Sequence, residues 1–225
     1  MRGDLTEGDI TKKLLLFALP LMAGNLLQQM YNVADTLIVG RFLGADALAA
    51  VGSSYTLMVF LTSILLGLCM GSSAFFSIQF GRKDMERLRT SFALSFLLIG
   101  AAALLLNLLS FAGLDWIIRA LQVPREVVRL MREYLFCIFF GIPATFLYNY
   151  FANLLRAVGD SVTPLLFLGV AAVMNIALDL VFVIVFRWGV AGAAAATVLS
   201  QYASGLGILL YYLLRFPELR VARRH

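Results

Sequence analysis

The 225-residue sequence is 61% hydrophobic and only 14% charged, with a mean hydropathy of +0.90. A water-soluble domain of this size needs far more polar surface, so the composition excludes an ordinary soluble protein and indicates an integral membrane protein. The net charge of +5 does not indicate nucleic acid as a partner, because the basic residues lie at the ends of apolar segments and form no basic stripe.

Six apolar segments are long enough to cross a membrane. A hydrocarbon core about 30 Å thick needs about 20 apolar residues per helix. The sequence therefore predicts an all-α integral membrane protein, in which residues 1–225 form a single lobe of six transmembrane helices. The predicted spans are 14–39, 47–78, 91–113, 134–155, 163–186 and 190–214.

The first predicted span carries a polar face with an acidic residue. Its polar side chains recur at spacings of three and four, which places them on one side of a helix: Gln28, Tyr31, Asn32 and Asp35. Pro20 lies earlier in the same span, where it removes a backbone hydrogen bond and permits a bend. We therefore expect Pro20 to be a hinge.

The later spans add polar groups and a second proline. The fourth span begins near Tyr134 and contains Pro143, a second candidate hinge for which a fixed kink is the alternative. Asn175 and Asp179 are four residues apart in the fifth span and share one side of the helix, and Thr197 lies in the sixth.

Two of these residues, Asp35 and Asp179, are carboxylates inside predicted spans, and no Lys or Arg lies well inside a span to neutralise them. Placing a charged carboxylate in a bilayer costs roughly 3 kcal/mol or more. Each acid is therefore expected to hold a proton or to bind a cation. For the single polar residues Gln28, Asn32 and Thr197, interhelical hydrogen bonding is the alternative, and Tyr31 and Tyr134 could instead belong to an interfacial belt.

The basic residues predict the orientation in the membrane. Twelve of the 18 Lys and Arg residues lie at the two termini and in the second and fourth loops. Because cytoplasmic loops are enriched in Lys and Arg, we expect both termini to be cytoplasmic, with the protein in the cell (inner) membrane.

Several stretches, in order and at matching spacing, resemble the multidrug and toxic compound extrusion (MATE) family. They are Pro20 followed by QQMYNVADTLIVGR at 28–41, ALAAVG from residue 47, LLRAVGDSVTP at 154–164, MNIALDL at 174–180 and GVAGAAAATVLSQ at 189–201. The resemblance covers essentially the whole chain, but only the first six helices of a family that normally has twelve.

The resemblance implies a function and a site. It implies cation-coupled efflux of small, drug-like organic compounds, with Na⁺ or H⁺ as coupling ion, no other cofactor and no enzymatic activity. The implied cation ligands, which for Na⁺ would be metal ligands, are Asp35, Asn175, Asp179 and Thr197. Tyr31 and Tyr134 match polar positions of the same cavity, to which helix geometry adds Gln28 and Asn32.

Membrane lipid, a small organic substrate and a missing second lobe are the expected partners. The favoured explanation of the missing lobe is a fragment of a full-length transporter; a half-transporter that pairs with a second copy and a separately encoded second half are the alternatives. Other functions remain open. A flippase for lipid-linked precursors would need basic residues inside its spans, which are absent, and an inactive membrane fragment would only assemble with other helices.

Overall fold

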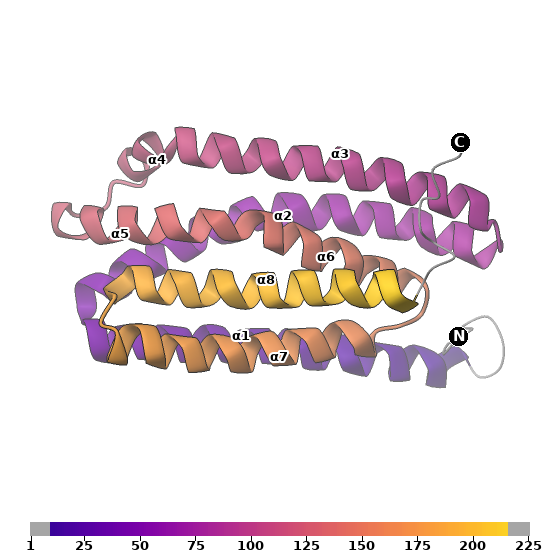
Figure 1. The fold of residues 1–225 in the computed structure, drawn as a ribbon, viewed down its shortest axis with the longest axis horizontal. Coiled ribbons are helices and arrows are strands. Elements are labelled where there is room, and N and C mark those ends of the chain that lie inside the picture. The colour runs from indigo at the N-terminus through magenta and orange to yellow at the C-terminus, as the bar shows by residue number, and fades with distance from the viewer. Residues whose placement is uncertain (1–9, 216–225) are drawn as a thin grey trace.

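Six helical stretches long and apolar enough to cross a membrane lie side by side in a computed structural model that describes residues 10–215 (Figure 1). They are Thr11–Leu43, Ala45–Gly81, Met85–Ala112, Arg125–Ala157, Val162–Val185 and Gly189–Arg215. Each predicted span overlaps one of them, and the expected all-α six-helix fold is confirmed. The start of the first stretch and the end of the last lie at the same end of the bundle (Figure 1).

The described residues form eight α-helices and two short segments of other helical geometry, and α4 lies between the third and fourth stretches. In chain order these are α1 (Ile10–Leu43), α2 (Ala45–Gly81), α3 (Met85–Ala112), α4 (Leu114–Ala120), α5 (Arg125–Ile138), the 3₁₀ turn η1 (Phe139–Gly141), α6 (Ile142–Ala157), α7 (Val162–Asp179), the π-helical stretch η2 (Leu180–Val185) and α8 (Gly189–Arg215). The fourth span thus contains α5, η1 and α6.

The fourth span begins at Arg125, earlier than the sequence predicts. After Pro124 the chain forms an amphipathic helix: Val127 and Met131 are buried in the bundle, whereas Arg125 and Arg129 are exposed. Charged residues interrupt the apolar ones in this part of the helix, so a search for continuous apolar runs does not include it in the span.

Tight turns with specific backbone geometry join the helices. Gly44 alone separates α1 from α2, with φ of 91°, a conformation that strains a residue with a Cβ. In the turn before α7, Asp160 accepts hydrogen bonds from the backbone N–H of Val162 (3.2 Å) and Thr163 (3.0 Å). The backbone N–H groups in the first turn of a helix have no acceptor within the helix, and the Asp160 carboxylate supplies one at the start of α7.

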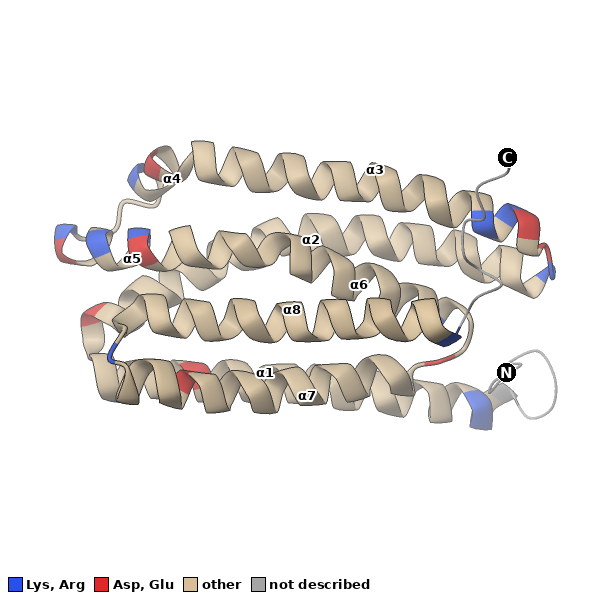
Figure 2. Cartoon of the chain, in the orientation of Figure 1, with Lys and Arg blue, Asp and Glu red and all other residues tan. Residues whose placement is uncertain are grey.

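Charged residues gather at the two ends of the bundle, with apolar helix surface between them (Figure 2). Leu97 and Leu108 are examples of that surface, 68% and 65% exposed respectively, which suits contact with lipid. One acidic patch on the paired α1 and α7 lies away from both ends (Figure 2). The basic residues Arg2, Arg220, Arg223 and Arg224, used above to predict orientation, lie outside the described residues.

Candidate functional site

The two acids inside the spans come together in the folded chain. Asp35 of α1 and Asp179, the last residue of α7, lie with their carboxyl groups within hydrogen-bonding reach of each other. Asp179 is fully buried, with an exposed fraction of 0%, and Asp35 is half-buried. Residues 144 positions apart in sequence therefore form one acidic pair, on the side of the bundle where α1 packs against α7 (Figure 2).

Within residues 10–215, three of the four carboxyl oxygens of this pair have no hydrogen-bond donor. Both oxygens of Asp179 and Oδ1 of Asp35 are buried and lack a partner. Two ionised carboxylates are both acceptors, so their contact becomes favourable only when a proton or a cation lies between them. The arrangement can therefore bind a proton or a cation.

Asn175 and Thr197 lie next to this pair and are joined to each other. Asn175, one helical turn before Asp179, is 2% exposed and donates through Nδ2 to Oγ1 of Thr197 at 3.2 Å. This bond links α7 to α8. Oδ1 of Asn175 is buried and has no partner among the described residues, so Asn175 adds an acceptor oxygen one turn of α7 before the Asp179 carboxylate.

The backbone changes from α-helix to π-helix directly after Asp179. The stretch Leu180–Val185 is π-helical, and the N–H of Phe186 donates to the oxygen of Val181. Such wide turns inside helices occur frequently at functional sites. Gly192 of α8 packs closely on this turn, because a Cβ there would lie 3.2 Å from the main-chain carbon of Phe182.

Two tyrosines predicted to line the cavity also lie at the acidic pair. Tyr134 of α5 is buried and lies close enough to interact electrostatically with Asp35, Asp179 and Tyr31. Tyr31 forms a side-chain hydrogen bond with Gln28 and lies near Asp35. These tyrosines connect the acidic pair to the polar face of α1.

Asn32 is not joined to the acidic pair by a hydrogen bond. Its Nδ2 donates to Oε1 of Gln29 at 3.4 Å, and its main-chain oxygen accepts from Thr36 at 2.8 Å. Gln28 is exposed and reaches the site only through Tyr31. Their spacing placed Gln28 and Asn32 on the same side of the helix as Asp35. Spacing alone does not decide which polar side chain turns toward the carboxylates.

The two prolines lie in different settings. Pro20 is inside the continuous helix α1. Pro143 opens α6 directly after the 3₁₀ turn, so the fourth span is broken there. The main-chain oxygens of Phe139 and Phe140 at this break accept hydrogen bonds from Asn107 of α3 (2.5 Å) and Tyr202 of α8 (3.0 Å).

Sequence reasoning missed further residues around the site. Tyr55 of α2 and Tyr148 of α6 lie near Tyr31, and Tyr148 donates to the main-chain oxygen of Pro164 at 3.0 Å. A tyrosine within an apolar run gives no sign of its neighbours in other helices. The polar Asn107, near the C-terminal end of the third span, was the available signal for the hydrogen bond to the Phe139 carbonyl.

Comparison with known proteins places the chain among transporters. The MatE family model matches residues 20–181. The probable multidrug resistance protein YpnP of Bacillus subtilis is 36% identical, over 92% of this chain and 47% of its own length. The multidrug export protein MepA of Staphylococcus aureus is 28% identical, over 92% of this chain and 46% of its own.

The solved structures agree with the sequence relatives. The outward-facing conformation of a multidrug resistance MATE family transporter of the MOP superfamily matches with a TM-score of 0.86 and 27% identity, over 96% of this chain and 49% of that one. The chain thus spans about half the length of the curated relatives it matches. From the family match, these transporter relatives and the six apolar helices, the chain belongs to the multidrug and toxic compound extrusion (MATE) family, of which it is an N-terminal half.

Proposed function

We propose that this chain is the N-terminal half of a cation-coupled exporter of small organic compounds, with H⁺ or Na⁺ as the coupling ion. The observation that carries the proposal is the pairing of Asp35 with the fully buried Asp179: three of their four carboxyl oxygens are buried and have no donor among the described residues. A carboxylate pair of this kind can take up an ion on one side of the membrane and release it on the other. Coupling of export to an ion gradient requires such a site.

The ligand set follows from the oxygens at the pair. For Na⁺, the two carboxylates, Oδ1 of Asn175 and the hydroxyl of Thr197 supply hard oxygen ligands. For H⁺, one proton shared by Asp35 and Asp179 suffices. Tyr31 and Tyr134 form the polar edge of the site toward the substrate cavity, with Gln28 behind Tyr31.

Ion binding changes the balance between two conformations. With both carboxyl groups charged, α1 and α7 repel each other at the pair; a bound ion removes this repulsion and allows α1 to bend near Pro20. The bend reshapes the cavity and releases the substrate. The ion can shift this equilibrium only by the difference between its affinities for the two conformations.

The second lobe completes the substrate cavity. The relatives are about twice as long as this chain, so we propose that a further six-helix lobe packs against the acidic side of the bundle. We favour its being the continuation of the same polypeptide. The complete protein then lies in the cytoplasmic membrane with the start of α1 and the end of α8 on the cytoplasmic side.

The test is ion-driven efflux of a fluorescent organic cation from vesicles that contain this chain together with its second lobe. An imposed H⁺ or Na⁺ gradient should drive efflux with the native chain. Asp35→Asn and Asp179→Asn should each abolish the gradient-driven part, whereas Asp46→Asn, an exposed acid at the start of α2, should leave it unchanged. Gradient-driven efflux at the native rate in both site variants would sink the proposal.

A further inference from the structure

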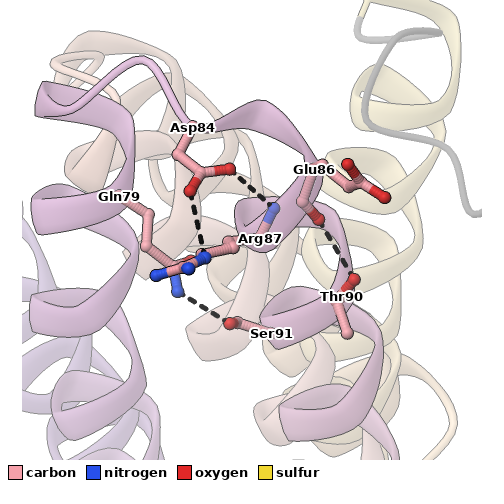
Figure 3. Close-up of polar contacts among 6 residues, drawn as sticks. All are labelled: Gln79, Asp84, Glu86, Arg87, Thr90 and Ser91. Carbon is pink, nitrogen blue, oxygen red and sulfur yellow. Dashed lines mark hydrogen bonds and ion pairs between the residues drawn. The ribbon is translucent and has the colours of Figure 1, made fainter.

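A cavity lies between the end of α2 and the start of α3, at the end of the bundle where α1 begins (Figure 1, Figure 3). Its volume is about 580 Å³. It is separate from the acidic pair, which lies toward the C-terminal ends of α1 and α7. The side chains that line it are Phe75, Gln79, Asp84, Glu86, Arg87, Thr90 and Ser91.

A buried amide faces this cavity with an unused acceptor. Gln79 is 7% exposed, and its Nε2 donates to Oγ of Ser91 at 2.8 Å (Figure 3). Its Oε1 is buried and has no partner. A buried acceptor without a donor is destabilising, so a ligand that carries an N–H group into this cavity would be favoured.

The rim of the cavity presents both signs of charge. Asp84 caps α3 by accepting from the backbone N–H of Arg87 at 3.1 Å, and its Oδ2 lies 3.2 Å from Nε of Arg87 (Figure 3). Glu86 adds a second carboxylate to the lining. A zwitterion satisfies such a rim better than a simple anion or a simple cation, because each of its charges meets an opposite one.

The cavity lies at the depth of lipid headgroups. Phe75, one turn of α2 before Gln79, is 57% exposed on the apolar side, while the turn beyond Gly81 carries the exposed Arg82 and Lys83. The change from apolar to charged surface marks the membrane boundary. A ligand here can have acyl chains along Phe75 and a polar head at Gln79 and Asp84.

We propose that this cavity binds the phosphoethanolamine headgroup of a membrane phospholipid. The ammonium group donates to Oε1 of Gln79 and to the Asp84 carboxylate, and the phosphate accepts from the Arg87 guanidinium. A choline headgroup has no N–H to donate, and a glycerol headgroup has no positive charge. The site therefore selects ethanolamine over choline and glycerol headgroups.

Native mass spectrometry of the purified chain, equilibrated with lipids that share their acyl chains, tests this proposal. The chain should retain phosphatidylethanolamine over phosphatidylcholine by about tenfold, the value expected for one hydrogen bond to a charged group. Stepwise methylation of the ammonium should weaken retention progressively. Equal retention of the two lipids would overturn the proposal. Complete displacement of the bound lipid by soluble phosphoethanolamine at equal concentration would also overturn it, because the ligand would then be a free solute and not a membrane lipid.

Two variants locate the binding in this cavity. Asp84→Asn keeps a residue that caps helices well and removes the charge, and Gln79→Met keeps the size and removes the acceptor. Each should bring the preference for ethanolamine close to parity. The control is Asp115→Asn, at the opposite end of the bundle, which removes a carboxylate that is also ion-paired, with Arg132. An undiminished preference in Asp84→Asn, or an equal loss in the control, would refute the assignment.

Discussion

The side-chain amide of Asn107 in α3 donates to the main-chain oxygen of Phe139, a carbonyl that lacks its α-helical donor because residue 143 is proline and that keeps only a 3₁₀ bond from the N–H of Ile142. Tyr202 of α8 donates to the next carbonyl, that of Phe140. The break in the fourth span is thus braced from two neighbouring helices. This favours a fixed kink at Pro143, and leaves Pro20, inside the continuous α1, as the candidate hinge.

Replacement of Asn107 should weaken the whole fold. Asn107→Leu leaves the Phe139 carbonyl with only the 3₁₀ hydrogen bond from the backbone N–H of Ile142, and we expect a loss of about 0.5–1.5 kcal/mol in the free energy of unfolding. Reversible unfolding in mixed detergent micelles measures this. Asn149→Leu is the control, because that side chain bonds only to a carbonyl of its own helix, Thr145, at 2.9 Å. Equal effects of the two variants would contradict the role of the brace.

Stability of the native chain should respond to an ion at the acidic pair. Three of the four carboxyl oxygens have no donor among the described residues, so either added Na⁺ or added H⁺ should raise the melting temperature by occupying the site. Asp179→Asn provides its own donor to Asp35 and should lose most of this response. Asp46→Asn should keep it. Thermal scans in Na⁺ and K⁺ at fixed ionic strength, repeated across pH, identify the ion; a native chain indifferent to both would refute ion binding.

The sequence predicted most of the fold and the centre of the candidate site. Apolar length is enough to place spans, because a bilayer imposes a minimum number of apolar residues on each helix. Asp35 and Asp179 were identifiable individually, since a carboxylate in lipid without a counter-ion is costly. That they meet depends on α1 packing against α7, which the residues of either helix alone do not determine.

Features that depend on contacts between helices were not predictable from the sequence. The π-helical stretch after Asp179 lies in the run Leu180–Val185, which reads as ordinary apolar helix. The brace by Asn107 and Tyr202 joins residues in three different spans. Asn32 shows the limit of periodicity: it lies one turn from Asp35, yet its amide bonds to Gln29.

Besides its proposed role as a Na⁺ ligand, the hydroxyl of Thr197 should matter by holding Asn175 in position. Thr197→Val preserves shape but removes the acceptor for Nδ2 of Asn175, so the amide is free to turn and its Oδ1 loses a fixed position. Loss of such supporting bonds typically lowers the affinity for a bound ion by about 10–100-fold. Thr197→Ser keeps the hydroxyl and should retain nearly native affinity in the same thermal titration. Equal affinities in the Val and Ser variants would show that the bond is unimportant.

Close packing of α8 on α6 should depend on Gly205. A Cβ at this position would lie 2.8 Å from the main-chain oxygen of Ala144, which cannot move aside as a flexible side chain would. Small residues at such crossings let helix backbones approach within a membrane. We expect Gly205→Ala to lower the free energy of unfolding by about 1–3 kcal/mol through this overpacking.

Gly67 in α2 offers the matched control for that substitution. A Cβ there meets nothing within 4 Å in the described chain, so Gly67→Ala has no clash and gains helix propensity of up to about 1 kcal/mol. The two variants add the same methyl group to two membrane helices. They should therefore change the unfolding free energy in opposite directions. A loss of stability in Gly67→Ala as large as in Gly205→Ala would mean that glycine is needed for a reason other than the contact with Ala144.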